Sequence, residues 1–140
     1  MKKYKIGYTT GVFDMFHIGH LNILRRAKEQ CDFLIVGVSD DDLVYSYKKK
    51  HPIVPVEDRM EILSSIRFVD QVVKQTSMDK FKAWEKLKFN VMFHGDDWKG
   101  SNLYNEIEEK LKAVNVDTIY LPHTDGISTT IITEIIKRRK

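Results

Sequence analysis

Two histidines, separated by two residues, are the groups in this sequence best suited to chemistry on an anion. His17 and His20 follow Gly11 in the stretch Gly-Val-Phe-Asp-Met-Phe-His-Ile-Gly-His. At this spacing both imidazoles face one side of a helix that begins near them, and Gly19 lets a ligand approach the backbone. Unpaired backbone N–H groups and the helix dipole favour an anion there, and neutral imidazoles can donate to its oxygens. We therefore expect a phosphate site at this turn.

Two other interpretations of the pair remain open, namely surface histidines and a metal-binding pair. The metal interpretation is the weaker one, because the glutamate and the third ligand of a zinc site are missing. Two common glycine-rich phosphate loops are also disfavoured. The seven glycines never form Gly-x-Gly-x-x-Gly, and Gly95–Ser101 has the glycine spacing of a Walker A loop without its lysine.

The elements that must position this turn alternate along the chain. Short runs rich in Val, Ile, Phe and Tyr predict strands at 5–8, 33–38, 71–73, 91–93 and 117–121. Apolar residues at helical spacing predict helices around 21–27, at 57–65, 78–88 and 102–113, and after Ser128 as a candidate N-cap. This alternation favours a doubly wound, Rossmann-like α/β fold. It would have a five-stranded parallel sheet in the order 3-2-1-4-5, with helices on both faces.

Such a sheet binds ligands in a crevice at the carboxyl ends of its first and fourth strands. In this chain those ends are followed by residues 9–20 and 95–100, the two stretches of most unusual composition. Topology and residue chemistry therefore predict the same site.

Length and composition predict one folded domain over residues 1–140. Hydrophobic residues make up 42% of the chain and charged residues 31%, which is typical of a globular protein. The net charge of +3 excludes a bulk polycation but leaves room for a local anion site. The chain has a lone cysteine, Cys31, and an amino terminus without a signal-type segment, so we expect a cytoplasmic protein. It has no apolar run of about 18 residues, so we expect no membrane span.

Several motifs together carry a resemblance to a known family. His-Ile-Gly-His resembles the H-x-G-H motif of the nucleotidylyltransferase superfamily, which includes class I aminoacyl-tRNA synthetases. Further matches are a lysine run that ends at Lys50, Glu-Asp-Arg at 57–59, Gly-Asp-Asp-Trp-Lys-Gly at 95–100, and His-Thr-Asp-Gly-Ile-Ser-Thr-Thr at 123–130, which is similar to the family's R-T-E-G-I-S-T-T. From Tyr4 to about Ile136 the chain resembles the cytidylyltransferases, and most closely the glycerol-3-phosphate cytidylyltransferases of teichoic acid precursor synthesis.

The resemblance implies transfer of a cytidylyl group from CTP to a phosphorylated alcohol, first of all sn-glycerol 3-phosphate. The products would be CDP-glycerol and pyrophosphate. A phosphate monoester is already an oxyanion at neutral pH, so the reaction needs alignment and positive groups rather than a base. Mg²⁺ would enter with the CTP phosphates, and no metal ligand of the protein is implied. The resemblance also implies a homodimer, and no nucleic-acid or membrane partner.

The resemblance further implies three groups of site residues. The catalytic residues would be His17, His20, Lys49 and Arg67, with Lys48 or Lys50 as alternatives to Lys49. The nucleotide-binding residues would be Gly11, Val12, Phe13, His17, His20, Asp97, Trp98, His123, Thr124, Gly126, Ile127, Ser128, Thr129 and Thr130. The residues that bind the second substrate would be Asp14, Lys48, Lys49, Lys50 and Arg59. Among them, the Asp97 carboxylate would accept from the cytosine amino group, a donor that uracil lacks.

Some of these residues also have simpler interpretations. Three lysines in a row form a solvated turn in many proteins, the hydroxyls at 128–130 suit helix capping, and Arg67 could pair with Asp70 on the surface. Two positions depart from the family pattern: His123 replaces an arginine and Val12 a small hydroxyl residue. Because imidazole is neutral or charged according to pH, we expect weaker or more pH-dependent nucleotide binding.

Other functions remain as alternatives. The nearest is the same chemistry on phosphocholine, phosphoethanolamine or another polyol phosphate, or with ATP in place of CTP. A more distant one is a non-catalytic module that binds nucleotides, or nucleic acid through the basic segments 48–50 and 137–140.

Overall fold

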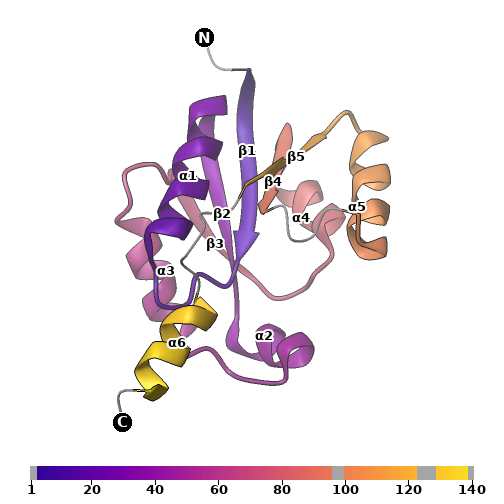
Figure 1. The fold of residues 1–140 in the computed structure, drawn as a ribbon. Coiled ribbons are helices and arrows are strands. Elements are labelled where there is room, and N and C mark those ends of the chain that lie inside the picture. The colour runs from indigo at the N-terminus through magenta and orange to yellow at the C-terminus, as the bar shows by residue number, and fades with distance from the viewer. Residues whose placement is uncertain (1–2, 96–99, 123–128, 139–140) are drawn as a thin grey trace.

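The computed structural model describes residues 3–95, 100–122 and 129–138, and five strands in these ranges form one sheet (Figure 1). The strands are β1 (Tyr4–Gly11), β2 (Cys31–Ser39), β3 (Gln71–Gln75), β4 (Val91–Gly95) and β5 (Asp117–Leu121). The helices of the described ranges are α1 (Ile18–Gln30), α2 (Asp41–Lys48), α3 (Val56–Ser64), α4 (Lys80–Leu87), α5 (Asn102–Lys112) and α6 (Thr129–Arg138).

All neighbouring strands run parallel, in the order β3-β2-β1-β4-β5. The predicted strand order is thereby confirmed. β1 is central, with Gly7 opposite Leu34 of β2 on one side and Val91 of β4 on the other. The carboxyl ends of the strands consequently meet at one edge of the sheet, where α2 and α6 lie in Figure 1.

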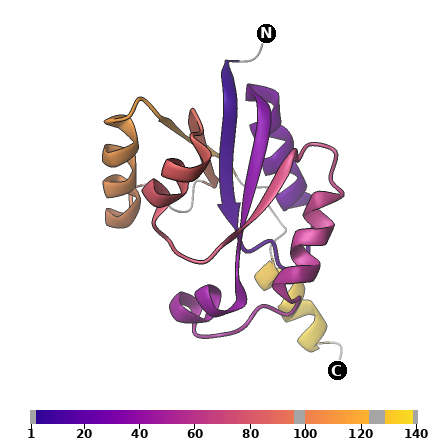
Figure 2. The ribbon, with the colours of Figure 1, turned by 180° about the vertical axis from the view of Figure 1, so that it is seen from behind.

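Helices cover both faces of the sheet, as the alternation predicts. Figures 1 and 2 show α1 and α3 on one face and α4 and α5 on the other. Leu24, Val36 and Phe93 belong to the buried cluster beneath α1 and α3, whereas Met92 and Leu111 belong to the cluster beneath α4 and α5. The central strands are buried on both faces, which explains their apolar runs without polar alternation.

One helix, α2, was not predicted from the sequence, and some observed boundaries differ from the predicted ones by one to three residues. α2 lies within the stretch that the analysis treated as a loop with a lysine run. The Asp40 side chain caps it by accepting from Leu43 N at 2.7 Å, and Lys49 ends it in the left-handed region, with φ of 59°. α2 is only eight residues long and has one buried residue, Val44, so its apolar periodicity is too short to detect.

A close approach between strands requires glycine beside the future site. A Cβ atom at Gly37 would lie 2.4 Å from the Tyr8 hydroxyl and 3.1 Å from Thr10 Cγ2. Gly37 therefore leaves room for the Tyr8 ring within the sheet. In the part of the chain that the structure describes, no helix is long and apolar enough to cross a membrane.

Candidate active site

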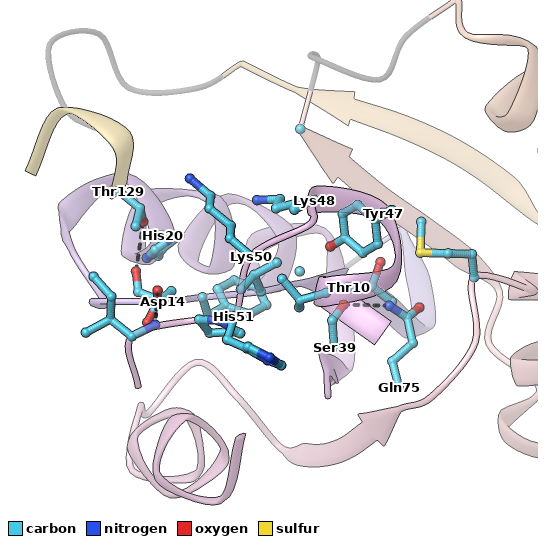
Figure 3. A pocket seen from close by; sticks show the side chains of 18 of the residues that line it. Thr10, Asp14, His20, Ser39, Tyr47, Lys48, Lys50, His51, Gln75 and Thr129 are labelled. Atoms are coloured by element: carbon cyan, nitrogen blue, oxygen red, sulfur yellow. Dashed lines mark hydrogen bonds between the residues drawn. The ribbon is translucent and has the colours of Figure 1, made fainter. Parts of the chain in front are cut away.

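A cavity of about 420 Å³ opens at the carboxyl ends of the strands, where the topology predicts a ligand. Figure 3 shows side chains from β1, α1, α2, β3 and α6 converging on it. The side chains at one end include those of His20, Asp14 and Thr129, whereas Ser39 and Gln75 lie at the other end. We call the first the histidine end and the second the inner end.

The two histidines fix each other at the start of α1. His17 is the N-cap, and its Nδ1 accepts from Gly19 N at 3.1 Å, while His20 Nδ1 accepts from His17 N at 3.2 Å. Their rings stack with centroids 3.9 Å apart. Since each Nδ1 is an acceptor, each neutral ring carries its hydrogen on Nε2, where it can be donated to a ligand.

Both imidazoles are neutral at pH 7. Burial lowers the pKa of His20 to about 3, with the positive charges of His17 and Lys48 acting in the same direction. Burial also lowers the pKa of the more exposed His17. The pair therefore supplies hydrogen-bond donors, and any fixed positive charge must come from other residues.

The structure brings Lys48 and Lys50 to the cavity, whereas Lys49 does not line it. Lys49 is exposed, and its backbone N–H donates to Tyr45 O at 2.9 Å as the cap of α2. Burial and the neighbouring Lys50 lower the pKa of Lys48. The first choice for the catalytic lysine, Lys49, is thus not among the residues that line the cavity, because α2 and its left-handed cap orient the alternatives, Lys48 and Lys50, toward it.

Asp14 joins the lysine-bearing loop to the histidine turn. Its carboxylate accepts from Ile53 N at 2.8 Å and from Val54 N at 2.9 Å, and the residue is 7% exposed. Phe13 and Met15 on either side have φ of 54° and 48°. Two departures into the left-handed region by bulky residues, on either side of Asp14, cost energy, which these hydrogen bonds offset. Asp14 therefore lines the cavity but directs its oxygens to the protein.

Arg59 is buried beneath the same loop. Nε donates to Val54 O at 2.8 Å, Nη1 to Val12 O at 2.7 Å and to Ser39 O at 2.8 Å, and Nη2 pairs with Asp41 Oδ1 at 2.6 Å. The side chain is fully enclosed. Arg59 was expected to contact a substrate, but within this chain its donors join the ends of β1 and β2 to α2 and the loop before α3.

Arg67 lies away from the cavity of its own chain. It is exposed, with its guanidinium 5.2 Å from the centre of the Phe68 ring, and it does not line the cavity. The suggested partner Asp70 instead accepts from Lys28 Nζ at 2.6 Å and from Leu34 N at 2.7 Å. The structure of one chain therefore gives no support to a catalytic role for Arg67.

The remaining expected nucleotide-binding residues divide into two groups. Gly11, Val12 and Phe13 line the cavity, as does Thr129, whose Oγ1 donates to Asp14 O at 2.8 Å. The other group lies outside the described residues: Asp97, Trp98, His123, Thr124, Gly126, Ile127, Ser128 and the side chain of Thr130.

The inner end holds functional groups that the sequence analysis missed. Lys80 begins α4, is 1% exposed, and donates through Nζ to Gln75 Oε1; Gln75 Nε2 in turn donates to Ser39 Oγ at 2.9 Å. Tyr47 shares a hydrogen bond with Ser39. All four side chains line the cavity. In the sequence, Lys80 is one of several lysines in a polar helix, so only the structure shows that it is buried.

Burial lowers the pKa of Lys80 to about 7. Of the described residues that line the cavity, Asp14 is the only carboxylate, and its oxygens are bonded to the loop. Next to this end, His94 is buried with its Nε2 unpartnered, and the centres of the His94 and Tyr104 rings lie 4.3 Å apart in an edge-on arrangement. Among the described residues, the inner end thus holds a buried amine that is cationic below pH 7, with no anion of the protein to pair with it.

In the described ranges, no group of three or more His, Cys, Asp or Glu side chains could hold a metal ion. Magnesium bound to a nucleotide takes most of its ligands from phosphate oxygens and water, so an all-protein cage is not required. The arrangement can orient anions, donate hydrogen bonds through the histidines and supply positive charge through lysines.

These features describe a cavity lined by histidine and lysine side chains on a Rossmann-like α/β domain, and comparison with known proteins identifies the family. The family described as "Cytidylyltransferase-like" matches residues 8–135, so the chain belongs to this family of nucleotidyltransferases. It is 37% identical over 135 residues to the glycerol-3-phosphate cytidylyltransferase of Bacillus subtilis, covering 91% of this chain and 94% of that protein. It is 39% identical over 134 residues to the FAD synthase of Pyrococcus horikoshii, covering 91% and 87%.

A solved structure supports the fold assignment. The lipopolysaccharide core biosynthesis protein from Thermoplasma volcanium superposes with a TM-score of 0.77 at 26% identity, covering 87% of this chain and 99% of that one. The resemblance stated from the sequence motifs is thereby confirmed at the level of the family.

Proposed function

We propose that this protein transfers the cytidylyl group of CTP to sn-glycerol 3-phosphate, giving CDP-glycerol and pyrophosphate. The observation that carries the choice of acceptor is the buried Lys80 at the inner end of the cavity. A phosphate oxygen of the acceptor attacks the α-phosphorus of CTP, and the bond from that phosphorus to the bridging oxygen of the β-phosphate breaks. The electron pair leaves with pyrophosphate, and no proton needs to be removed from the attacking dianion.

The histidine turn stabilises the charge that develops on the α-phosphate. The Nε2 hydrogens of His17 and His20 donate to its oxygens, and the capping box holds the rings in place before the substrate arrives. Because these rings are neutral, the positive charge that offsets the repulsion between the two anionic substrates comes from Lys48 and Lys50, which line the cavity together with His20. Rings fixed by the backbone need little rearrangement at the moment of reaction.

The inner end favours a neutral polyol over a cationic head group. Phosphocholine and phosphoethanolamine carry an ammonium group, which the charged form of Lys80 repels, with no carboxylate among the described lining residues to compensate. The hydroxyls of glycerol can instead exchange hydrogen bonds with Gln75, Ser39 and Tyr47. A phosphorylated polyol is therefore the acceptor class that fits these groups.

The choice of nucleotide rests on the motif at 95–100, of which residues 96–99 lie outside the described ranges. We propose that Asp97 accepts from the cytosine amino group and that the substrate is the magnesium complex of CTP. The similarity to a FAD synthase keeps adenylyl transfer from ATP as the second candidate.

A pyrophosphate-release screen tests these assignments. CTP, ATP, GTP and UTP are each combined with Mg²⁺ and with sn-glycerol 3-phosphate, phosphocholine, phosphoethanolamine or FMN. We expect turnover with CTP and sn-glycerol 3-phosphate above every other pair. Turnover only with ATP would establish the second candidate, and no turnover with CTP for any acceptor would contradict the proposal.

We also propose that the protein works as a cytoplasmic homodimer. Support for the dimer comes from Ile131, Ile135 and Ile136, which lie on α6 with 41%, 44% and 48% of their surfaces exposed. Such side chains on one short helix favour burial against a second copy. Sedimentation equilibrium distinguishes a dimer from a monomer.

A further inference from the structure

α6 presents three polar side chains to the cavity at steps of four residues. Thr129, Thr133 and Lys137 all line it, and this spacing is one face of a helix. Thr129 Oγ1 donates to Asp14 O at 2.8 Å, and Thr133 Oγ1 donates to Thr129 O at 2.9 Å. Both hydroxyl hydrogens are thus used within the protein, so Lys137 provides the charge of this face.

Lys137 has only a weak interaction with its neighbour on the helix. Its Nζ lies 4.0 Å from Glu134 Oε1, and the two side chains are 67% and 56% exposed. An ion pair of this length and exposure contributes little, because both groups remain solvated. The ammonium group can therefore turn to a ligand in the cavity.

The direction of phosphoryl transfer indicates which ligand lies within reach of Lys137. Figure 3 shows Thr129 of α6 close to His20 and Asp14, at the opposite end of the cavity from Ser39 and Gln75. In phosphoryl transfer the attacking and leaving oxygens lie on opposite sides of the phosphorus. With the acceptor at the inner end and the α-phosphate at the histidines, the leaving group points toward α6.

We propose that Lys137 binds the β- and γ-phosphates of CTP and, after the transfer, the pyrophosphate that leaves. This inference rests on the proposed function, since the position of the acceptor sets the direction of the leaving group. Lys137 is placed to neutralise charge that moves onto the bridging oxygen as the bond breaks. The flexible lysine stem suits this role, because pyrophosphate must finally leave through the same side.

Direct binding by the full chain tests the role of Lys137 without requiring turnover. Isothermal titration calorimetry with Mg²⁺ compares inorganic pyrophosphate, CTP and CMP on the wild type, Lys137→Gln and Arg138→Gln. Arg138 is the matched control, because it is exposed on the same turn and does not line the cavity. We expect Lys137→Gln to weaken pyrophosphate and CTP roughly fivefold and to leave CMP unchanged, since CMP lacks the distal phosphates. Arg138→Gln should bind all three like the wild type.

The outcomes separate this inference from the proposed function. If the wild type binds CTP, and Lys137→Gln binds pyrophosphate and CTP as tightly as the wild type does, the role of Lys137 is refuted while the proposed function stands. A loss that is equal for CMP and CTP, or equal in Arg138→Gln, also refutes it, because the effect is then not tied to the distal phosphates. If the wild type binds neither CTP nor pyrophosphate, both proposals fail.

Discussion

At the scale of single residues, the histidine pair combines two tasks that substitutions can separate. The Nδ1 atoms complete the capping box of α1, and the Nε2 atoms remain for the ligand. Asparagine has a side-chain oxygen that accepts from nearby backbone N–H groups, as an N-cap requires, but it lacks a donor at the distance of Nε2. Asparagine at these positions therefore keeps the cap and deletes the phosphate contact.

We predict that His17→Asn and His20→Asn each lower kcat/KM about 100-fold, the usual cost of one lost donor to a developing charge. Their melting temperatures should stay within a few degrees of the wild type. His20→Ala is the comparison variant: it should lose activity and, in addition, about 1 kcal/mol of stability, because the half of the capping box that accepts from His17 N is gone. Steady-state kinetics and thermal unfolding measure both quantities. Activity of His20→Asn within threefold of the wild type would rule out the phosphate role.

At the scale of elements, Arg59 explains how the end of α2 and the loop after it hold Lys48 and Lys50 at the cavity. Its buried guanidinium connects β1, β2, α2 and the segment before α3 through four donor contacts. Asp14 adds two backbone contacts to the same segment. The position of Lys48 and Lys50 relative to the histidines therefore depends on a rigid network rather than on the lysine loop alone.

We predict that Arg59→Lys lowers the free energy of unfolding by about 3 kcal/mol. One ammonium group cannot reach all the acceptors of the planar guanidinium, so buried carbonyl groups are left unpaired. It should also lower kcat/KM more than tenfold through misplacement of the lysines. Urea unfolding and kinetics on the same samples test this.

The control is Arg25→Lys, since Arg25 is exposed and donates to Asn22 Oδ1 at 2.9 Å. It should change stability by no more than about 0.5 kcal/mol. Unchanged stability of Arg59→Lys together with a raised KM would instead indicate direct substrate contact by Arg59.

The sequence predicts the sheet well and the site only in part, for identifiable physical reasons. Apolar runs buried on both faces have a strong pattern, so the five strands and their order were predicted correctly. α2 was missed because eight residues carry too little periodicity. As a consequence, the sequence did not indicate which lysines line the cavity, since the helix and its left-handed cap at Lys49 place Lys48 and Lys50 there.

Buried charge is the second feature that the sequence does not reveal. Arg59 and Lys80 are each 1% exposed, yet they occur in polar segments that resemble solvated helix surfaces. Their burial depends on partners up to 47 residues away, such as Val12 for Arg59. Side-chain burial of this kind is a tertiary property that neither composition nor periodicity encodes.

At the scale of the whole molecule, positive and negative charges nearly cancel along the chain, but positive charge is concentrated at the cavity. The net charge is only +3, but Lys48, Lys50, Lys80 and Lys137 line the cavity with a single described carboxylate, Asp14. Such a cavity attracts two anionic substrates at once. Its charge depends on pH, because burial lowers the pKa of Lys80 to about 7.

This dependence leads to a prediction about the acceptor. Below pH 7 Lys80 is charged and attracts the anionic acceptor, and above pH 7 it becomes neutral before the acceptor binds. The KM for sn-glycerol 3-phosphate, measured at saturating CTP, should therefore rise roughly tenfold between pH 7 and pH 8.5. The acceptor itself does not cause this rise, since its phosphate has a second pKa near 6 and is already a dianion over this range. In Lys80→Met the KM should be high at all pH values, with the rise abolished. A wild-type KM that stays constant from pH 7 to 8.5 would show that Lys80 does not bind the acceptor in its charged form.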